Sequence, residues 1–167
     1  VLRPEVERHL EAGPLVISSP TGSGKSTQVP RWCTARGPVL VVEPRRVACR
    51  GLALRVSQLE QVTLGAAVGY HVRDDRRAGT NTRILFATPG IVLQMLTRDD
   101  LSGFSTVLLD EFHERSLEVD LLLALLMRRY RGALGVMSAT LDGPRVARHL
   151  GGAHLHAEGR MYPVECR

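Results

Sequence analysis

Short apolar runs alternate with longer amphipathic segments along most of this chain. The apolar runs predict strands at 15–18, 38–43, 83–87, 106–109 and 134–138, with a weaker candidate at 153–157, where alternating histidines are equally typical of a loop. The segments between them predict helices at 25–35, 45–61, 90–97, 117–131 and 143–150. Strands that alternate with helices indicate βαβ units, and therefore an α/β fold with a mostly parallel sheet and helices on both faces. Such sheets bind their ligands at the carboxyl ends of the strands.

Length and composition fit one ordinary globular domain. The 167 residues, 44% of them hydrophobic, are enough to bury roughly 70% of the extended surface in a single core. The net charge of +5 favours polyanionic partners, but only weakly. We expect the arginine-rich segments 73–77 and 128–131 to be solvated charge, with nucleic-acid contact as the less favoured alternative.

Cysteine usage and hydropathy bear on the compartment. Cys33, Cys49 and Cys166 are an odd number at wide spacings, which fits neither a disulfide framework nor a zinc site and favours a reducing, cytoplasmic location. The apolar run 121–127 is too short to cross a bilayer, and the chain shows no secretion signal, so no membrane partner is expected. Because the chain opens on Val1 rather than Met, we interpret it as a fragment.

The basic residues are 21 arginines and one lysine, and that lysine lies in a glycine-rich segment. Residues 19–26 (SPTGSGKS) follow a predicted strand and precede a predicted helix, as a phosphate-binding loop does. Glycine-rich backbone N–H groups can cradle a β-phosphate at the helix N-terminus, with Lys25 reaching the β- and γ-phosphates and the Ser26 hydroxyl holding Mg²⁺. The expected nucleotide contacts are Thr21, Gly22, Ser23, Gly24, Lys25, Ser26 and Thr27. Ser19 departs from the glycine that opens this pattern, and a plain glycine-rich turn is the alternative.

Two adjacent acids end the predicted strand 106–109. Asp110 and Glu111 follow four apolar or small residues directly, and paired carboxylates at a buried strand end are costly unless a cation compensates them. We therefore expect Asp110 and Glu111 to hold Mg²⁺, directly or through water, and Glu111 to orient an attacking water. The alternative is an acidic N-cap for the following helix.

The run Asp110-Glu111-Phe112-His113 resembles the D-E-x-H box of the DEAH-box helicases, and with residues 114–116 it looks most like the bacterial HrpB type. Other segments agree with that family in order and rough spacing. They are 43–48 (EPRRVA), 68–73 (VGYHVR), 88–90 (TPG), 138–140 (SAT), and 158–160 (EGR) with 162–164 (YPV). Each is weak alone, and the ordered set carries the resemblance over roughly residues 10–165.

The resemblance implies the first RecA-like domain of a P-loop NTPase motor over residues 1–157, followed by the start of a linker, 158–167, toward a second RecA-like domain. It implies ATP and Mg²⁺ as cofactors and single-stranded or partly duplex RNA as partner, with DNA left open. The implied catalytic residues are Lys25, Asp110, Glu111 and His113. Ser138 and Thr140 would couple the nucleotide state to strand separation. Arg45, Arg46 and Thr88 would grip the nucleic-acid backbone.

Two other functions stay open at this point. A small-molecule phosphotransferase would also use a P-loop, but it would not need the 138–140 element or the Arg45-Arg46 pair. A non-catalytic nucleic-acid-binding module with a relict nucleotide site is the second. In the helicase family the arginine fingers come from the partner domain, and such a finger contributes roughly 10³–10⁵ in rate. We therefore expect this chain alone to bind nucleotide but to hydrolyse ATP hardly at all.

Overall fold

One eight-stranded sheet, with strand order β4-β3-β5-β2-β6-β7-β1-β8, runs through the whole molecule. In the computed structural model the described residues are 2–99, 101–139 and 142–157. The strands are β1 (Leu15–Ser18), β2 (Val39–Val42), β3 (Val68–Val72), β4 (Asp75–Arg77), β5 (Ile84–Ala87), β6 (Thr106–Leu109), β7 (Ala133–Ser138) and β8 (Ala153–His156). All neighbouring pairs are parallel except β3–β4, so the predicted mostly parallel sheet is confirmed.

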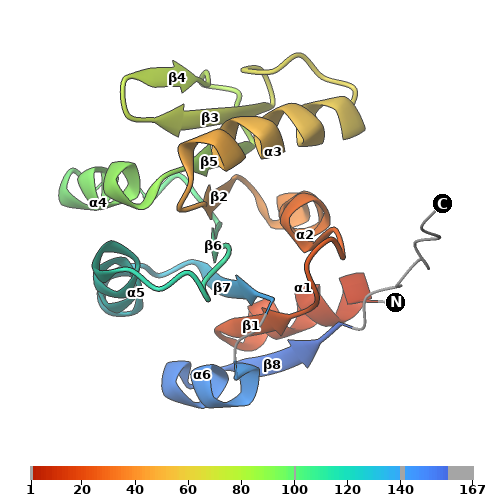
Figure 1. Cartoon of the computed structure of the whole chain (residues 1–167), viewed down its shortest axis with the longest axis vertical. Coiled ribbons are helices and arrows are strands. Elements are labelled where there is room, and N and C mark those ends of the chain that lie inside the picture. Colours follow the sequence, from red (N-terminus) through yellow and green to blue (C-terminus); the bar gives the residue numbers. More distant parts are fainter. Residues whose placement is uncertain (1, 100, 140–141, 158–167) are drawn as a thin grey trace, which may run out of the picture.

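Helices cover both faces of this sheet (Figure 1). They are α1 (Leu2–Ala12), α2 (Lys25–Cys33), α3 (Arg46–Leu59), α4 (Pro89–Thr97), α5 (Leu117–Arg129) and α6 (Gly143–Leu150), with a 3₁₀ turn at Thr34–Arg36. None of the helices among the described residues combines the length and apolar character needed to cross a membrane.

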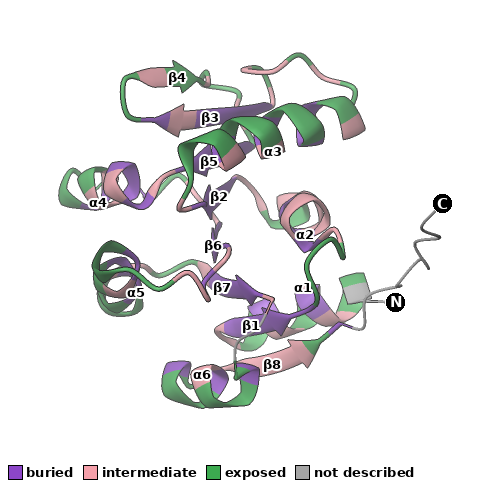
Figure 2. Cartoon of the chain, in the orientation of Figure 1, coloured by how far each residue is buried: buried purple, intermediate pink, exposed green. Residues whose placement is uncertain are grey.

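Alternating residues of the strands pack into two separate hydrophobic cores, one on each face of the sheet. Leu15 and Ile17 of β1 pack with α1, α2 and α3, whereas Val16 between them packs with α4, α5 and α6. Successive side chains of a strand point to opposite faces, so the central strands are apolar at nearly every position. Figure 2 shows the result as buried strands between helices whose outer faces are exposed. The predicted two-sided covering of the sheet is therefore confirmed.

The predicted elements are confirmed with small shifts at their ends. The helix expected over 25–35 ends at Cys33 and continues as the 3₁₀ turn, and the helix expected over 117–131 ends at Arg129. The weak candidate 153–157 is a strand, β8. Its alternating His154 and His156 both lie within 3.0 Å of the Ser18 hydroxyl on β1, which accounts for polar residues at those two positions.

Residues 73–77, interpreted as solvated charge, are mostly exposed, but three of them form a strand that the sequence analysis did not predict. Asp75–Arg77 form β4, an antiparallel edge strand paired with β3, although Arg76 and Arg77 remain exposed. The hairpin needs glycine at position 69, because a Cβ there would lie 2.2 Å from the Arg77 carbonyl oxygen. A short charged edge strand resists pairing with other sheets.

The carboxyl ends of the central strands line up on one edge. Ser18 of β1 is in register with Ser138 of β7, and Val42 of β2 is in register with Leu109 of β6. The glycine-rich loop, the acidic pair and the segment after β2 therefore start from neighbouring points. The predicted linker, 158–167, lies outside the described residues, so its boundary stays a prediction.

Candidate nucleotide site and nucleic-acid edge

The loop after β1 has the backbone shape of a phosphate cradle. Gly22 and Gly24 adopt φ of 78° and 83°, a left-handed conformation that favours glycine. A Cβ at Gly22 would meet nothing within 4 Å, so backbone conformation rather than space requires glycine there. Gly24 is also the N-cap of α2, whose first turn carries no acidic residue. The helix N-terminus therefore offers unopposed positive potential to an anion.

The departure at Ser19 does not disturb this loop. Ser19 is buried and its φ is not positive, so the position does not demand glycine. Its N–H donates to the Ser138 carbonyl at 3.1 Å, and its hydroxyl lies 2.7 Å from the Ser23 hydroxyl. The serine thus closes the loop by a hydrogen bond that a glycine could not make.

Asp110 presents a buried oxygen with no partner. The residue is 2% exposed, and its Oδ1 accepts the Glu111 N–H at 2.9 Å. Its Oδ2 has no hydrogen-bond partner among the described residues. Burial raises the pKa of Asp110, and the nearby Ser26 hydroxyl offsets part of that rise. A buried acceptor oxygen beside a serine hydroxyl is the donor set that a hard cation such as Mg²⁺ prefers, so the residues fit the predicted metal.

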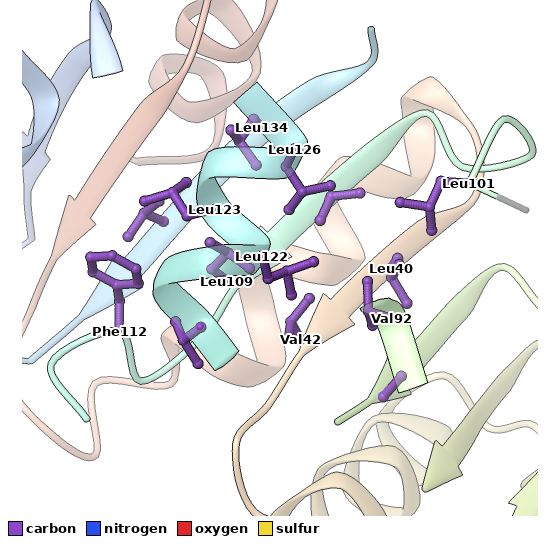
Figure 3. Packing of buried hydrophobic residues seen from close by; sticks show 14 of the residues in the cluster. Leu40, Val42, Val92, Leu101, Leu109, Phe112, Leu122, Leu123, Leu126 and Leu134 are labelled. Atoms are coloured by element: carbon purple, nitrogen blue, oxygen red, sulfur yellow. The ribbon is translucent and has the colours of Figure 1, made fainter. Parts of the chain in front are cut away.

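Glu111 is held in a left-handed conformation, φ 48°, immediately after β6. Such a backbone costs on the order of 1 kcal/mol or more for a residue other than glycine. The flanking residues hold it there. The Asp110 N–H donates to the Val42 carbonyl at 2.8 Å, and the Phe112 N–H donates to the Met137 carbonyl at 3.0 Å. The Phe112 ring is buried beside Leu123 of α5 (Figure 3).

The sharp turn aims the Glu111 carboxylate at the P-loop. Its Oε1 lies 3.6 Å from Lys25 Nζ, and its Oε2 lies 3.2 Å from His113 Nε2. Lys25 itself is 7% exposed. The residues predicted to be catalytic, Lys25, Asp110, Glu111 and His113, are therefore gathered at one point, which fits the prediction; their roles stay predictions.

His113 connects this cluster to the end of β7. Its Nδ1 lies 3.4 Å from the Ser138 hydroxyl and accepts from the Ala139 N–H at 3.4 Å. With Nδ1 accepting, Nε2 carries the proton and donates toward Glu111. Ser138 is fully buried. The second predicted coupling residue, Thr140, lies outside the described residues.

The residues predicted to contact nucleic acid lie after the neighbouring strands β2 and β5. Arg45 is the N-cap of α3 and Thr88 is the N-cap of α4, and neither helix has an acidic residue in its first turn. Arg45 and Arg46 are exposed. Two helix N-termini and two arginines on adjacent strand ends form a surface that suits phosphates.

Two acids that the predicted site omits lie between these regions. Glu43 follows β2, is 2% exposed and accepts the Arg45 N–H at 3.0 Å. Burial, helped by the negative charge of nearby Asp110, raises the pKa of Glu43 to about 7, although the hydrogen bond from the Arg45 N–H lowers it in part. Glu114 forms an ion pair with the Arg45 guanidinium. A lone acid directly after a fully apolar strand, as at Glu43, is the signal that could have identified the first.

A hollow of about 860 Å³ lies elsewhere, between α5 and α6. Phe112, Leu123, Met127 and Val146 contribute to its lining, and the P-loop does not. The P-loop lines a smaller hollow of about 190 Å³, with Ser23, Gly24 and Lys25 among its lining residues.

A glycine-rich cradle before a helix, with an acidic pair that follows the second strand away, defines a P-loop NTPase of RecA-like fold. The chain belongs to the DEAD/DEAH box helicase family, whose profile matches residues 5–149.

Similar proteins agree with this assignment. The chain is 43% identical over 98% of its length to an Escherichia coli (strain K12) protein named ATP-dependent RNA helicase HrpB, and it covers 22% of that protein. It is 39% identical over 90% of its length to human ATP-dependent RNA helicase DHX33, covering 24% of it. The crystal structure of E. coli DExH-box NTPase HrpB matches 97% of this chain with a TM-score of 0.87 and 42% identity. The chain thus spans less than a quarter of these relatives' length.

Proposed function

We propose that this chain is the nucleotide-binding motor domain of an ATP-dependent RNA helicase of the DEAH type. The observation that carries the proposal is the turn at residues 110–114, which contacts the P-loop lysine at one end and Arg45 at the other. A phosphotransferase or a relict scaffold has no need of that connection. We propose RNA rather than DNA as the nucleic acid because these relatives are named RNA helicases.

In this proposal the chain binds the triphosphate by its P-loop. The N–H groups at the start of α2 and the Lys25 ammonium hold the β- and γ-phosphates, and Ser26 with Asp110 would hold Mg²⁺. A bound Mg²⁺ neutralises charge that develops on the phosphates during transfer. The unpartnered Asp110 Oδ2 is the feature that favours a cation at this place.

Glu111 then orients the attacking water. Its carboxylate points into the cradle while paired with Lys25. When a γ-phosphate takes Lys25, Glu111 is freed to accept a hydrogen bond from a water in line with the scissile bond. His113 links Glu111 to Ser138 and Ala139 through its two ring nitrogens, so we propose that a change at the γ-phosphate reaches β7 by this route.

The edge after β2 and β5 binds the sugar–phosphate backbone in this account. Arg45, Arg46 and Thr88 offer the charge and hydrogen bonds that phosphates and sugars accept or donate, and these groups carry no sequence information. We therefore expect affinity with little sequence preference and with a steep dependence on salt.

Two further proposals concern context. A second RecA-like domain would supply the arginine fingers that complete the site. The buried, unpaired thiols of Cys33 and Cys49 favour a reducing compartment such as the cytoplasm.

The test compares the full chain that carries this domain with residues 1–167 alone. We expect single-stranded RNA to stimulate ATP hydrolysis by the full chain. We expect the isolated domain to bind Mg·ADP but to hydrolyse ATP on the order of 10³-fold more slowly, because it lacks the fingers. Brisk, Lys25-dependent hydrolysis by the isolated domain would contradict the proposal.

A further inference from the structure

Arg45 and Arg46 are neighbours in sequence but differ in what they contact. The Arg45 guanidinium donates two hydrogen bonds to the Glu114 carboxylate. Its Nε donates to Oε2 at 3.1 Å, and its Nη2 donates to Oε1. Arg46 forms no ion pair among the described residues. One of the two proposed phosphate contacts is therefore already occupied by a carboxylate.

A carboxylate and a phosphate compete for the same face of a guanidinium. Both accept two parallel N–H···O bonds from its planar fork. The backbone of Arg45 is held independently, since its N–H donates to Glu43 Oε1 at 3.0 Å. The side chain is 69% exposed, so an RNA phosphate can reach it from solvent and exchange for Glu114 without moving the helix.

Glu114 belongs to the same tight turn as the water-orienting residue. The Glu114 N–H donates to the Glu111 carbonyl at 2.8 Å, and Glu111 sits in the strained conformation with its carboxylate on Lys25. Anchoring Glu114 to α3 fixes one end of this turn. Releasing it removes a restraint on Glu111.

We infer that Glu114 is a positioning residue that mimics an RNA phosphate. In the RNA-free state it occupies Arg45 and holds the 111–114 turn with Glu111 on Lys25; RNA takes Arg45, releases Glu114 and lets Glu111 reorient toward water. This inference rests on the proposed function and gives it a route by which RNA stimulates hydrolysis.

The test uses the full chain that carries this domain, comparing the parent with Glu114→Gln. Three quantities are measured: ATP hydrolysis without RNA, hydrolysis at saturating RNA, and affinity for a fluorescent single-stranded oligoribonucleotide by anisotropy. We expect RNA-free hydrolysis to rise about fivefold and RNA affinity about threefold, as suits a partly exposed ion pair. The rate at saturating RNA stays within about twofold of the parent. The stimulation ratio therefore shrinks.

Two further variants distinguish loss of the Arg45–Glu114 contact from the loss of a negative charge alone. Glu118→Gln removes an equal charge from an exposed site on α5 and should leave the stimulation ratio unchanged. Arg45→Ala breaks the same contact from the other side, so it should raise RNA-free hydrolysis by the same factor as Glu114→Gln. The double variant should add nothing to either. If Glu114→Gln does not fold, Glu114→Asp takes its place. The aspartate keeps the charge but is too short to accept from both Arg45 nitrogens, so it should also reduce the stimulation ratio.

The outcomes are distinguishable. If RNA stimulates the parent but Glu114→Gln behaves as Glu118→Gln does, the inference is overturned and the proposed function stands. If RNA neither binds the parent nor stimulates it, the proposed function fails and the inference falls with it.

Discussion

Lys25 and Asp110 beside the P-loop are buried, and the charged residues there already contact one another, whereas Arg45 and Arg46 after β2 are exposed to solvent. Lys25 and Asp110 are 7% and 2% exposed, and Lys25, Glu111 and His113 form a chain of contacts. Arg45 is 69% exposed at its side chain. Interactions between buried charges are strong and depend on geometry, but those at an exposed edge are weak singly and screened by salt. A small rigid ligand suits the first region, and a long flexible polyanion suits the second.

The largest effect is expected where the two regions meet at Glu111. Glu111→Gln in the full chain should lower RNA-stimulated ATP turnover about 10²–10³-fold, because a neutral amide replaces the carboxylate that orients the water and can take its proton. Mg·ATP affinity should stay close to that of the parent, since the P-loop is intact. The measurement is steady-state hydrolysis beside a direct binding titration, with Glu118→Gln as control. Full turnover in the Gln variant would remove Glu111 from the mechanism.

The second prediction concerns the buried carboxyl of Glu43, whose raised pKa should make the stability of the domain depend on pH. Its pKa is about 7 when folded, against 4.5 for a free side chain, so between these values the unfolded chain loses a proton that the folded chain keeps. Stability therefore falls as pH rises from 4.5 to 7, by about 3 kcal/mol at most. Glu43→Gln should be as stable as the parent near pH 4.5 and more stable by up to that amount at pH 8.

This comparison needs chemical denaturation at both pH values with EDTA present, because a bound cation would change the charge balance near Asp110. As a control, Glu118→Gln changes an exposed acid, and its difference in stability from the parent should not depend on pH. A Glu43→Gln difference that does not grow with pH would contradict the assignment.

On the exposed edge, single changes should cost less and should depend on salt. Arg46→Ala should weaken binding of single-stranded RNA about tenfold, equally for different sequences, and lower the slope of log affinity against log salt by about one. Mg·ADP affinity should not change. Sequence-dependent weakening would mean that Arg46 reads bases.

The smallest effect is expected at Ser19. Ser19→Gly restores the usual first residue of the P-loop pattern but removes the hydrogen bond to Ser23. Because the backbone there is not left-handed, glycine brings no conformational benefit, and nucleotide affinity should change by less than about threefold. A large gain in affinity would show that the serine impairs the site.

The sequence predicts the central strands well because each is a short, mostly apolar run bounded by turn residues, as 15–18 and 106–109 are. The elements that the pattern misses have weak or misleading signals. Among the residues of α1 whose burial is described, only Val6 and Leu10 lie in the core, too few for a clear helical period. In β3, Gly69 and His71 interrupt the apolar residues, and β4 is made of charged residues that only pairing with β3 turns into a strand.

The site is predictable where a motif is local and not where it depends on folding. Residues 21–27 form one continuous segment, and Asp110 and Glu111 are adjacent, so the sequence alone predicts their chemistry. The contact between Arg45 and Glu114 joins residues 69 positions apart, and no local pattern indicates it. The left-handed Glu111 is equally invisible, because hydrogen bonds from its neighbours to β2 and β7 impose it.

The central claim is that the buried cluster after β1 and β6 is a nucleotide site built on Lys25. Calorimetric titration of Mg·ADP into this chain, beside Lys25→Ala, tests it most directly. We predict saturable one-to-one binding by the parent and affinity about 10–100-fold lower in the variant, the loss expected for a charged hydrogen bond. Equal binding by the two, or none by a well-folded parent, would contradict the claim.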